Sequence, residues 1–172
     1  MPPSTPLGYN PGMIGILSDS HDNLDALEKA IRFFQDAGCA LLIHAGDFVA
    51  PFSARVLNRS GCGLKAVFGN CDGEKEGLKA IIGSFGTIRR APYCFFYEGK
   101  KIALTHLDAP AGGLAARREY DLVVYGHTHR PEIRTAGSTL LVNPGETGGQ
   151  VTGRSTVALY DPATGRASIH TL

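Results

Sequence analysis

The chain has 172 residues, of which 43% are hydrophobic and 19% are charged. This length suits one ordinary domain, and this balance is typical of a globular protein rather than a disordered one. The formal net charge of +1 gives no large field that would favour a nucleic acid or a membrane as partner. Four cysteines without CxxC spacing, no signal peptide and no long apolar run predict a soluble cytoplasmic protein with reduced thiols.

The first half of the chain alternates predicted strands with predicted helices. Three short apolar runs are the expected strands: 13–17, 40–43 and 64–68. Apolar residues at a 3.6-residue period predict a helix over 24–34, capped by Asp22 or Asn23. A second helix is expected from Pro51, a favoured first-turn residue, and a short third one around Leu78. This alternation favours a parallel sheet with right-handed crossovers.

The second half is richer in predicted antiparallel strands. A β-hairpin is expected around Glu98-Gly99-Lys100, followed by an Ala-rich helix over 113–119 and a strand over 122–125. The remaining strand-like runs are 132–135, 139–142, 155–160 and 167–171. The whole pattern predicts one α/β domain over residues 1–172, with residues 1–12 as a flexible tail.

Ligand-type side chains follow five of the predicted strands. They are Asp19, His21, Asp47, Asn70, His106, His127 and His129. In open α/β sheets, ligands bind outside the carboxyl ends of the strands, so these side chains are expected to converge. Two pairs have i, i+2 spacing, which places both side chains on one side of an extended segment. Asp19 alone would be a helix cap or turn residue, and Asn70 alone an ordinary turn residue, but together the residues predict a shared site.

The chemistry of this set favours transition metals. Two aspartates, one asparagine and four histidines offer oxygen and nitrogen donors, which suit Mn, Fe, Co, Ni or Zn better than Ca or Mg. Seven ligands exceed the needs of one ion and indicate two ions that share a carboxylate. Such a pair of ions is the standard clamp for in-line displacement at phosphorus.

Five ordered blocks resemble those of the calcineurin-like metallophosphoesterases. They are Asp19-Ser20-His21, Gly46-Asp47, Gly69-Asn70-Cys71-Asp72, Thr105-His106 and Gly126-His127-Thr128-His129. The similarity spans residues 13 to about 146 and is closest to the small single-domain prokaryotic phosphodiesterases. It implies a four-layer α/β/β/α sandwich of two mixed sheets. It also implies hydrolysis of a small-molecule phosphoester by a hydroxide that bridges two metal ions, with Mn expected first and Ni, Fe, Co or Zn as alternatives.

The resemblance also implies roles for individual residues. One ion would be held by Asp19, His21, Asp47 and His129. The other would be held by Asp47, Asn70, His106 and His127, with Asp47 bridging. The expected catalytic residues are Asn70, Cys71, Asp72 and His106.

The chain departs from the family pattern at two places. Many relatives have a histidine where Cys71 stands, and that histidine is thought to protonate the leaving group or bind phosphate. Cys71 is either a structural thiol or an active-site one. As an acid it is poorly matched, because two cations would lower its pKa and favour thiolate. Leu107 and Asp108 replace the Gly-His that follows the equivalent of His106 in many close relatives, so the substrate-facing rim differs.

The remaining histidines and cysteines have structural interpretations. His44 is expected to be a packed residue or to support the ligands, and His170 to be a surface residue. The other cysteines, Cys39, Cys62 and Cys94, are expected to be small core residues. The alternative function is a scaffold on the same fold, like the metallophosphatase-like subunit of the retromer coat. The sequence leaves homo-oligomerisation open.

Overall fold

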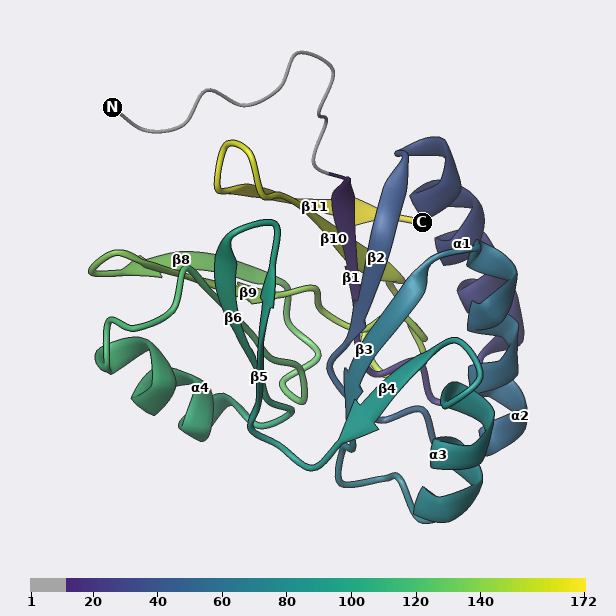
Figure 1. Ribbon diagram of the computed structural model, residues 1–172. Coiled ribbons are helices and arrows are strands. Elements are labelled where there is room, and N and C mark those ends of the chain that lie inside the picture. The colour runs from purple at the N-terminus through teal and green to yellow at the C-terminus, as the bar shows by residue number, and fades with distance from the viewer. Residues whose placement is uncertain (1–11) are drawn as a thin grey trace.

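The computed structural model describes residues 12–172 as two mixed β-sheets packed face to face, with helices on both outer faces (Figure 1). The predicted four-layer α/β/β/α arrangement is therefore confirmed. The tail expected at residues 1–12 lies, apart from Gly12, outside the described residues. Within the described part of the chain, no helix is long and apolar enough to cross a membrane.

The first sheet has six strands in the order β11-β10-β1-β2-β3-β4. Its strands are β1 (Met13–Leu17), β2 (Cys39–His44), β3 (Gly63–Val67), β4 (Gly86–Arg89), β10 (Thr156–Asp161) and β11 (Arg166–Thr171). Strands β1 to β4 are parallel, and for β1, β2 and β3 the alternation of strands and helices predicts this. Strand β10 is antiparallel to β1, and β11 is antiparallel to β10.

The second sheet has five strands in the order β5-β6-β7-β9-β8. They are β5 (Tyr93–Tyr97), β6 (Lys100–Leu104), β7 (Leu122–Val124), β8 (Glu132–Ala136) and β9 (Thr139–Asn143). Strands β6, β7 and β9 are parallel, whereas β5 and β8 are antiparallel edge strands. The carboxyl ends of β1, β2, β3, β6 and β7 therefore provide the loops around the site.

The helices cover the outer face of each sheet (Figure 1). On the first sheet lie α1 (Leu24–Asp36), α2 (Pro51–Ala54), the 3₁₀ helix η1 (Arg55–Ser60) and α3 (Lys75–Ile82). On the second sheet lies α4 (Asp108–Ala116). Helix α1 begins where predicted, because the Asn23 side chain accepts a hydrogen bond from the backbone N–H of Ala26 at 3.1 Å.

Three apolar cores separate the four layers. Successive residues of β1 show how the sequence produces them, because side chains alternate across a strand. Ile14 and Ile16 face the second sheet, whereas Leu17 faces the helices. Gly15 also faces the helices, and a Cβ there would lie 2.6 Å from the Phe34 ring, so α1 packs closely only over a glycine. A third core lies between α4 and the second sheet.

Several local predictions are wrong. Strand β4 was not predicted, because its four residues include a single buried side chain, Ile88. The helix expected at 113–119 is α4, which begins five residues earlier at Asp108; Pro110 is tolerated in a first turn, where its missing N–H has no helical partner. The helix after Pro51 is one α turn that continues as η1.

The cysteine prediction is only partly right. Cys62 is buried and Cys39 is half-buried, but Cys94 is exposed. Cys94 is wrong as a core residue because β5 alternates: the preceding Tyr93 faces the space between the sheets, so Cys94 faces outward.

Candidate metal centre

The seven ligand-type residues lie in loops that follow the carboxyl ends of five strands. Five of these residues have positive φ angles: Asp19 (52°), His21 (42°), Asp47 (61°), His127 (67°) and His129 (59°). Non-glycine residues rarely adopt this left-handed region, and such strain clusters at functional sites. The geometry predicted from the i, i+2 spacing is wrong, because neither the Asp19/His21 pair nor the His127/His129 pair lies on extended backbone. The side chains are instead aimed by tight left-handed turns.

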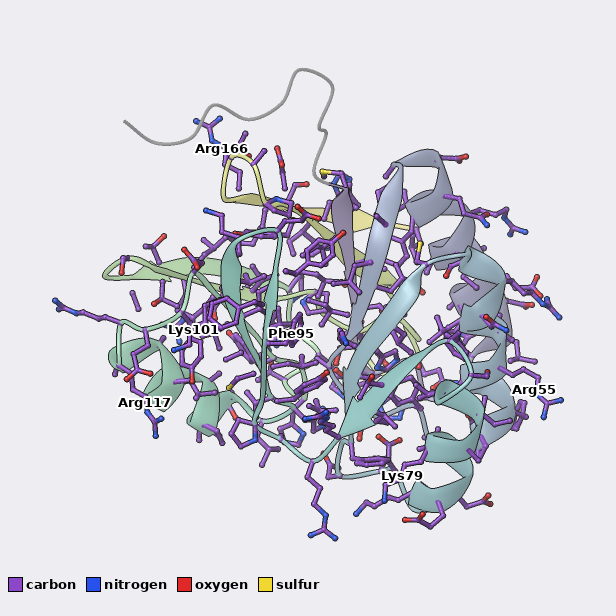
Figure 2. The ribbon with its side chains drawn as sticks, viewed as in Figure 1. Arg55, Lys79, Phe95, Lys101, Arg117 and Arg166 are labelled. Carbon is purple, nitrogen blue, oxygen red and sulfur yellow. The ribbon has the colours of Figure 1, made fainter. Side chains whose placement is uncertain are left out.

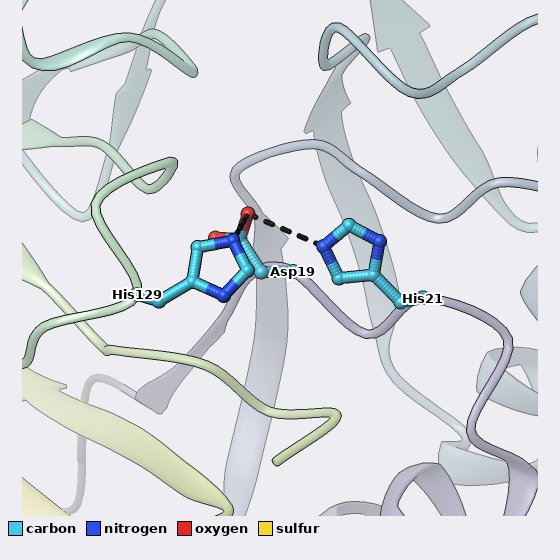
Figure 3. A group of neighbouring side chains, drawn as sticks. All are labelled: Asp19, His21 and His129. Atoms are coloured by element: carbon cyan, nitrogen blue, oxygen red, sulfur yellow. Dashed lines mark ion pairs between the residues drawn. The ribbon is translucent and has the colours of Figure 1, made fainter. Parts of the chain in front are cut away.

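A first group consists of Asp19, His21 and His129 (Figure 3). Asp19 Oδ1 lies 3.8 Å from His21 Nε2 and 3.4 Å from His129 Nε2. The other carboxylate oxygen, Oδ2, accepts hydrogen bonds from the Ser18 hydroxyl at 2.6 Å and the His127 N–H at 3.1 Å. These donors fix the carboxylate so that Oδ1 faces both imidazoles.

A second group consists of Asn70, His106 and His127. Because His106 Nδ1 donates to the carbonyl of Ala45 at 2.7 Å, its Nε2 carries a lone pair in the neutral ring. That Nε2 lies 2.8 Å from Asn70 Oδ1 and 3.4 Å from Asp47 Oδ2. His127 Nδ1 lies 3.0 Å from the same Asn70 oxygen. Several electron-pair donors therefore face one another.

Asp47 lies between the two groups. Its Oδ1 accepts the backbone N–H of Cys71 at 2.8 Å. Its Oδ2 lies 3.7 Å from His21 Nε2 and 3.4 Å from His106 Nε2. One oxygen of one carboxylate thus faces a histidine from each group, which is the position that a shared ligand needs.

The mutual proximity of these groups shifts their pKa values. The nearby Asp19 carboxylate raises the pKa of His21, and this outweighs the effect of its burial. Burial lowers the pKa of His106, but the bond to Asp47 outweighs it and the net shift is upward. Burial raises the pKa of Asp47, but His106 and the Cys71 N–H outweigh it and hold that pKa far below its usual range. The carboxylates are therefore anionic, and they favour a cation between themselves and the imidazoles.

Unpartnered polar atoms show that these residues fit a metal. Asp19 Oδ1, His21 Nε2 and His129 Nδ1 are buried and make no hydrogen bond among residues 12–172. A buried carboxylate oxygen without a partner is costly. Carboxylate oxygen and imidazole nitrogen are the donors that divalent transition ions prefer, so a bound ion would satisfy Asp19 Oδ1 and His21 Nε2.

Asp72, predicted as catalytic, has both carboxylate oxygens occupied by backbone. Its Oδ2 accepts the N–H groups of Gly69 at 2.7 Å and Asp47 at 3.1 Å, and its Oδ1 accepts that of Val49 at 2.8 Å. It is almost fully buried, with 3% of its surface exposed. This side chain ties the loop after β2 to the loop after β3, which positions Asp47 beside Asn70.

Cys71 lies at the exposed edge of the cluster, with Sγ 3.4 Å from Asn70 Nδ2. Partial burial, the bond to Asp47 and the nearby carboxylates raise its pKa to about 11. In the metal-free protein the group is therefore a neutral thiol at neutral pH. The predicted thiolate applies to the protein with two cations bound, because those cations would lower the pKa of the thiol.

His44 forms hydrogen bonds to the loops that follow β1 and β2, so it supports the ligands, which is one of the two roles predicted for it. Its Nδ1 accepts the Gly46 N–H at 3.1 Å, so Nε2 is protonated and donates to the Ser20 hydroxyl at 2.9 Å. It stacks on Phe48 with ring centroids 3.6 Å apart. Complete burial lowers its pKa to about 3, which keeps the ring neutral. His170, in β11, is half-buried and not fully on the surface as predicted, because its ring lies against that of Phe33 in α1, with centroids 4.9 Å apart.

Glu146 is a part of the site that sequence reasoning missed. Its carboxylate is fully buried and lies 3.4 Å from His129 Nδ1. It accepts the N–H groups of Val151 and Thr152 and the Thr152 hydroxyl, at 2.8 to 2.9 Å. Burial raises the pKa of Glu146, but these donors outweigh it and the net shift is downward. The only signal for this residue in the sequence is an acidic side chain in a glycine-rich loop.

Two cavities adjoin the cluster on different sides. One of about 310 Å³ lies beside Asn70 and His106, and its other lining residues are Phe68, Gly69, Ala91, Pro92, Thr105, Leu107 and Pro110. Its lining contains no charged side chain other than the titratable His106. A smaller cavity of about 190 Å³ lies beside His129. The rim residue Leu107 thus faces the apolar cavity, as its position after His106 suggests.

A known protein family matches most of the chain. Residues 13–165 match the family model of the calcineurin-like phosphoesterase superfamily domain. The chain belongs to this superfamily. Membership in the calcineurin-like phosphoesterases confirms the predicted metal-dependent phosphoesterase.

Individual relatives in the superfamily cover nearly the whole chain. Phosphodiesterase MJ0936 of Methanocaldococcus jannaschii is 35% identical in an alignment of 158 residues that covers 86% of this chain and 92% of that protein. A solved structure of a novel archaeal phosphodiesterase superposes with a TM-score of 0.88 at 31% identity, over 93% of this chain and 99% of that one. Vacuolar protein sorting 29 of Cryptosporidium parvum has a TM-score of 0.68 at 14% identity, over 95% and 98%, and shares the fold alone.

Proposed function

We propose that this protein is a phosphodiesterase that holds two divalent metal ions, with manganese as the first choice. Asp19, His21 and His129 would hold one ion, and Asn70, His106 and His127 the other, with Asp47 shared between them. The observation that carries the proposal is the position of Asp47 Oδ2, which lies 3.7 Å from His21 Nε2 and 3.4 Å from His106 Nε2.

The proposed hydrolysis depends on the side chains that the protein would place around a bound phosphate. When bound, such ions lower the pKa of coordinated water and neutralise charge on phosphate oxygens. Ser18 and the His127 N–H hold Asp19, while Ala45 holds the ring of His106 in one tautomer. The protein thus arranges the ligands before substrate arrives, so little reorganisation is needed during the reaction.

The leaving group would receive limited help from a side chain. Cys71 is the exposed thiol at the edge of the cluster, and two bound cations would lower its pKa and favour the thiolate, which has no proton to donate. Without an effective general acid, esters with good leaving groups should react much faster than alkyl esters.

The preference for diesters is supported by the apolar cavity beside Asn70 and His106. A diester carries a second ester group that can occupy this cavity, whereas a monoester carries an extra charge in its place. The lining offers no lysine or arginine to balance that charge, so an aryl diester is the better match.

The test is steady-state hydrolysis of bis(4-nitrophenyl) phosphate against 4-nitrophenyl phosphate, with Mn, Ni, Zn and Mg in turn. We expect turnover of the diester with at least one transition ion, slower turnover of the monoester, and loss of both after chelation. His127→Ala should abolish diester turnover, whereas the matched change His170→Ala, in β11, should leave it unchanged. Equal rates with and without chelator would refute the proposal.

A scaffold is the second candidate, because the fold is shared with vacuolar protein sorting 29 and Cys71 replaces the histidine of many relatives. The same assay separates the two functions. Protein that binds its ions fully and yet hydrolyses no ester in the screen would favour the scaffold.

A further inference from the structure

The cavity beside His129 has the chemistry of an anion site. Its volume is about 190 Å³, and it is lined by His129, Arg130, Pro131, Thr152, Arg154 and Thr156. His129 belongs to both this cavity and the first ligand group, where its Nε2 lies 3.4 Å from Asp19 Oδ1. Anything bound in the cavity would therefore contact the edge of the metal cluster.

A buried hydroxyl without a partner lies in the wall of this cavity. Thr156 is 4% exposed, and its Oγ1 makes no hydrogen bond within residues 12–172. A Cβ at Gly145 would lie 2.2 Å from that oxygen and 3.1 Å from Pro131 Cδ. Gly145, with a φ of 81°, thus packs directly against the hydroxyl, where any side chain would collide with it. An unsatisfied buried hydroxyl in the wall of a cavity is a donor available to a ligand.

Two arginines line the same cavity and are not neutralised by other side chains. Arg130 and Arg154 form no ion pair with any residue in the described part of the chain. The nearby Glu146 carboxylate instead accepts three hydrogen bonds from Val151 and Thr152. Guanidinium groups bind phosphate through parallel N–H bonds, so both arginines remain available for an anion.

The loop that carries Arg154 is held in place. The Thr152 hydroxyl donates to Glu146 Oε2 at 2.8 Å and accepts the Arg154 N–H at 3.3 Å. Glu146 in turn lies behind His129. The arginine loop is therefore held to a buried carboxylate that lies 3.4 Å from His129 Nδ1, which keeps the cavity beside the metal cluster.

We propose that this cavity is a subsite for a second phosphate group of the substrate, held by Arg130, Arg154 and the Thr156 hydroxyl. The inference rests on the proposed phosphodiesterase function and narrows its substrate class. The preferred substrates are phosphodiesters that carry another phosphate close to the scissile bond. The apolar cavity beside Asn70, on the other side of the cluster, would receive the uncharged ester group.

The experiment compares two esters that differ by one phosphate. They are thymidine 5′-(4-nitrophenyl phosphate) and its 3′-phosphorylated counterpart, and both release 4-nitrophenolate. We expect kcat/KM to be at least about tenfold higher for the 3′-phosphorylated ester, the usual size of a charge-assisted contact to phosphate. Arg154→Gln should lower this ratio at least about fivefold, and Thr156→Val should lower it by a smaller factor.

Arg166→Gln is the matched control. Arg166 is the exposed first residue of β11, next to the turn that follows β10, at the edge opposite to the carboxyl ends of β1 and β2 (Figure 2). This change removes the same charge and should leave the ratio as in the wild type. A fall in the ratio equal to that of Arg154→Gln would mean that net charge alone explains the preference, and would overturn the subsite.

Further outcomes keep the two proposals apart. If neither ester is hydrolysed, the phosphodiesterase proposal fails; if both are hydrolysed at equal kcat/KM, only the subsite fails. Inorganic phosphate should inhibit hydrolysis of the plain ester equally in the wild type and in Arg154→Gln. Inhibition lost in Arg154→Gln alone would assign the cavity to free phosphate and overturn the substrate assignment.

Discussion

The two ligand groups differ in their surroundings although they lie side by side. In the first group, Asp19 is completely buried, and His129 is backed by the buried carboxylate of Glu146. In the second group, Asn70 and His127 are exposed, and every side chain is neutral when it binds a metal. The carboxylate shared with the second group is that of Asp47, whose Oδ2 lies 3.4 Å from His106 Nε2.

This difference indicates that the two groups have different roles, one in tight metal binding and the other in binding the ester. Carboxylates that hold and orient ligands raise the affinity for a metal, so the first group should bind its ion more tightly. The second group opens onto the apolar cavity through Asn70 and His106, so it should be the side on which the ester group is bound.

The largest expected effect is that of Asp47→Asn, which removes the carboxylate common to both groups. Occupancy should fall at both positions, whereas His21→Ala should mainly empty the first. Bound ions supply several kcal/mol of charge stabilisation, so diester kcat/KM should fall by roughly 10³-fold or more. Metal content and kinetics should be measured together, with Asp25→Asn in α1 as the matched control. Full occupancy in Asp47→Asn would contradict the sharing of this residue.

Glu146→Gln should lower the metal affinity of the first group and leave that of the second group unchanged. The amide keeps an acceptor for the Val151 or Thr152 donors but removes the negative charge beside His129. Loss of such a carboxylate behind a ligand histidine typically costs about 10- to 100-fold in metal affinity. Calorimetric titration should show the loss for the tighter ion alone. Thr152→Val, which removes a hydrogen bond but keeps the carboxylate, is the control; equal losses in both variants would indicate a purely structural role.

Metal binding should depend on pH through His21 and His106. Their pKa values are raised in the metal-free protein by Asp19 and Asp47 respectively, and only the neutral imidazole binds a metal. Below the raised pKa, protons compete, so affinity should fall as pH falls, by about tenfold per pH unit for each proton displaced. Calorimetry at about pH 6, below the ordinary histidine pKa of about 6.5, in two buffers of different protonation enthalpy measures the protons released. Binding without any proton release would contradict the raised pKa values.

Cys71→Ala should have the smallest effect, less than about tenfold on the aryl diester, because a good leaving group needs little general acid help. The exposed Cys94 offers a matched control in Cys94→Ala. Turnover of bis(4-nitrophenyl) phosphate and metal content are the measurements. If Cys71→Ala abolished activity while both ions stayed bound, the thiol would have a direct chemical role.

The repeating parts of this structure could be predicted from the sequence. The helix over Leu24–Asp36 and the parallel strands follow from the spacing of apolar residues. The ligand-type residues were found because polar donors directly follow buried strands. Strand β4 was missed because an edge strand with one buried residue, Ile88, has almost no periodic signal.

The non-repeating parts could not be predicted, because they depend on contacts between distant loops. His127 and His129 are two residues apart, yet left-handed turns direct them into different groups. Glu146 lies beside His129 only because the loop after β9 folds back toward that histidine. No local pattern around either residue encodes such an approach.

The most direct test of the shared site is a titration of the metal-free protein with Mn²⁺, followed by measurement of the metal content after saturation. We expect two ions per chain that bind in two resolved steps, with Glu146→Gln weakening only the tighter step. A content of one ion or fewer per chain at saturation would contradict the assignment of Asp47 as a ligand shared between two metals.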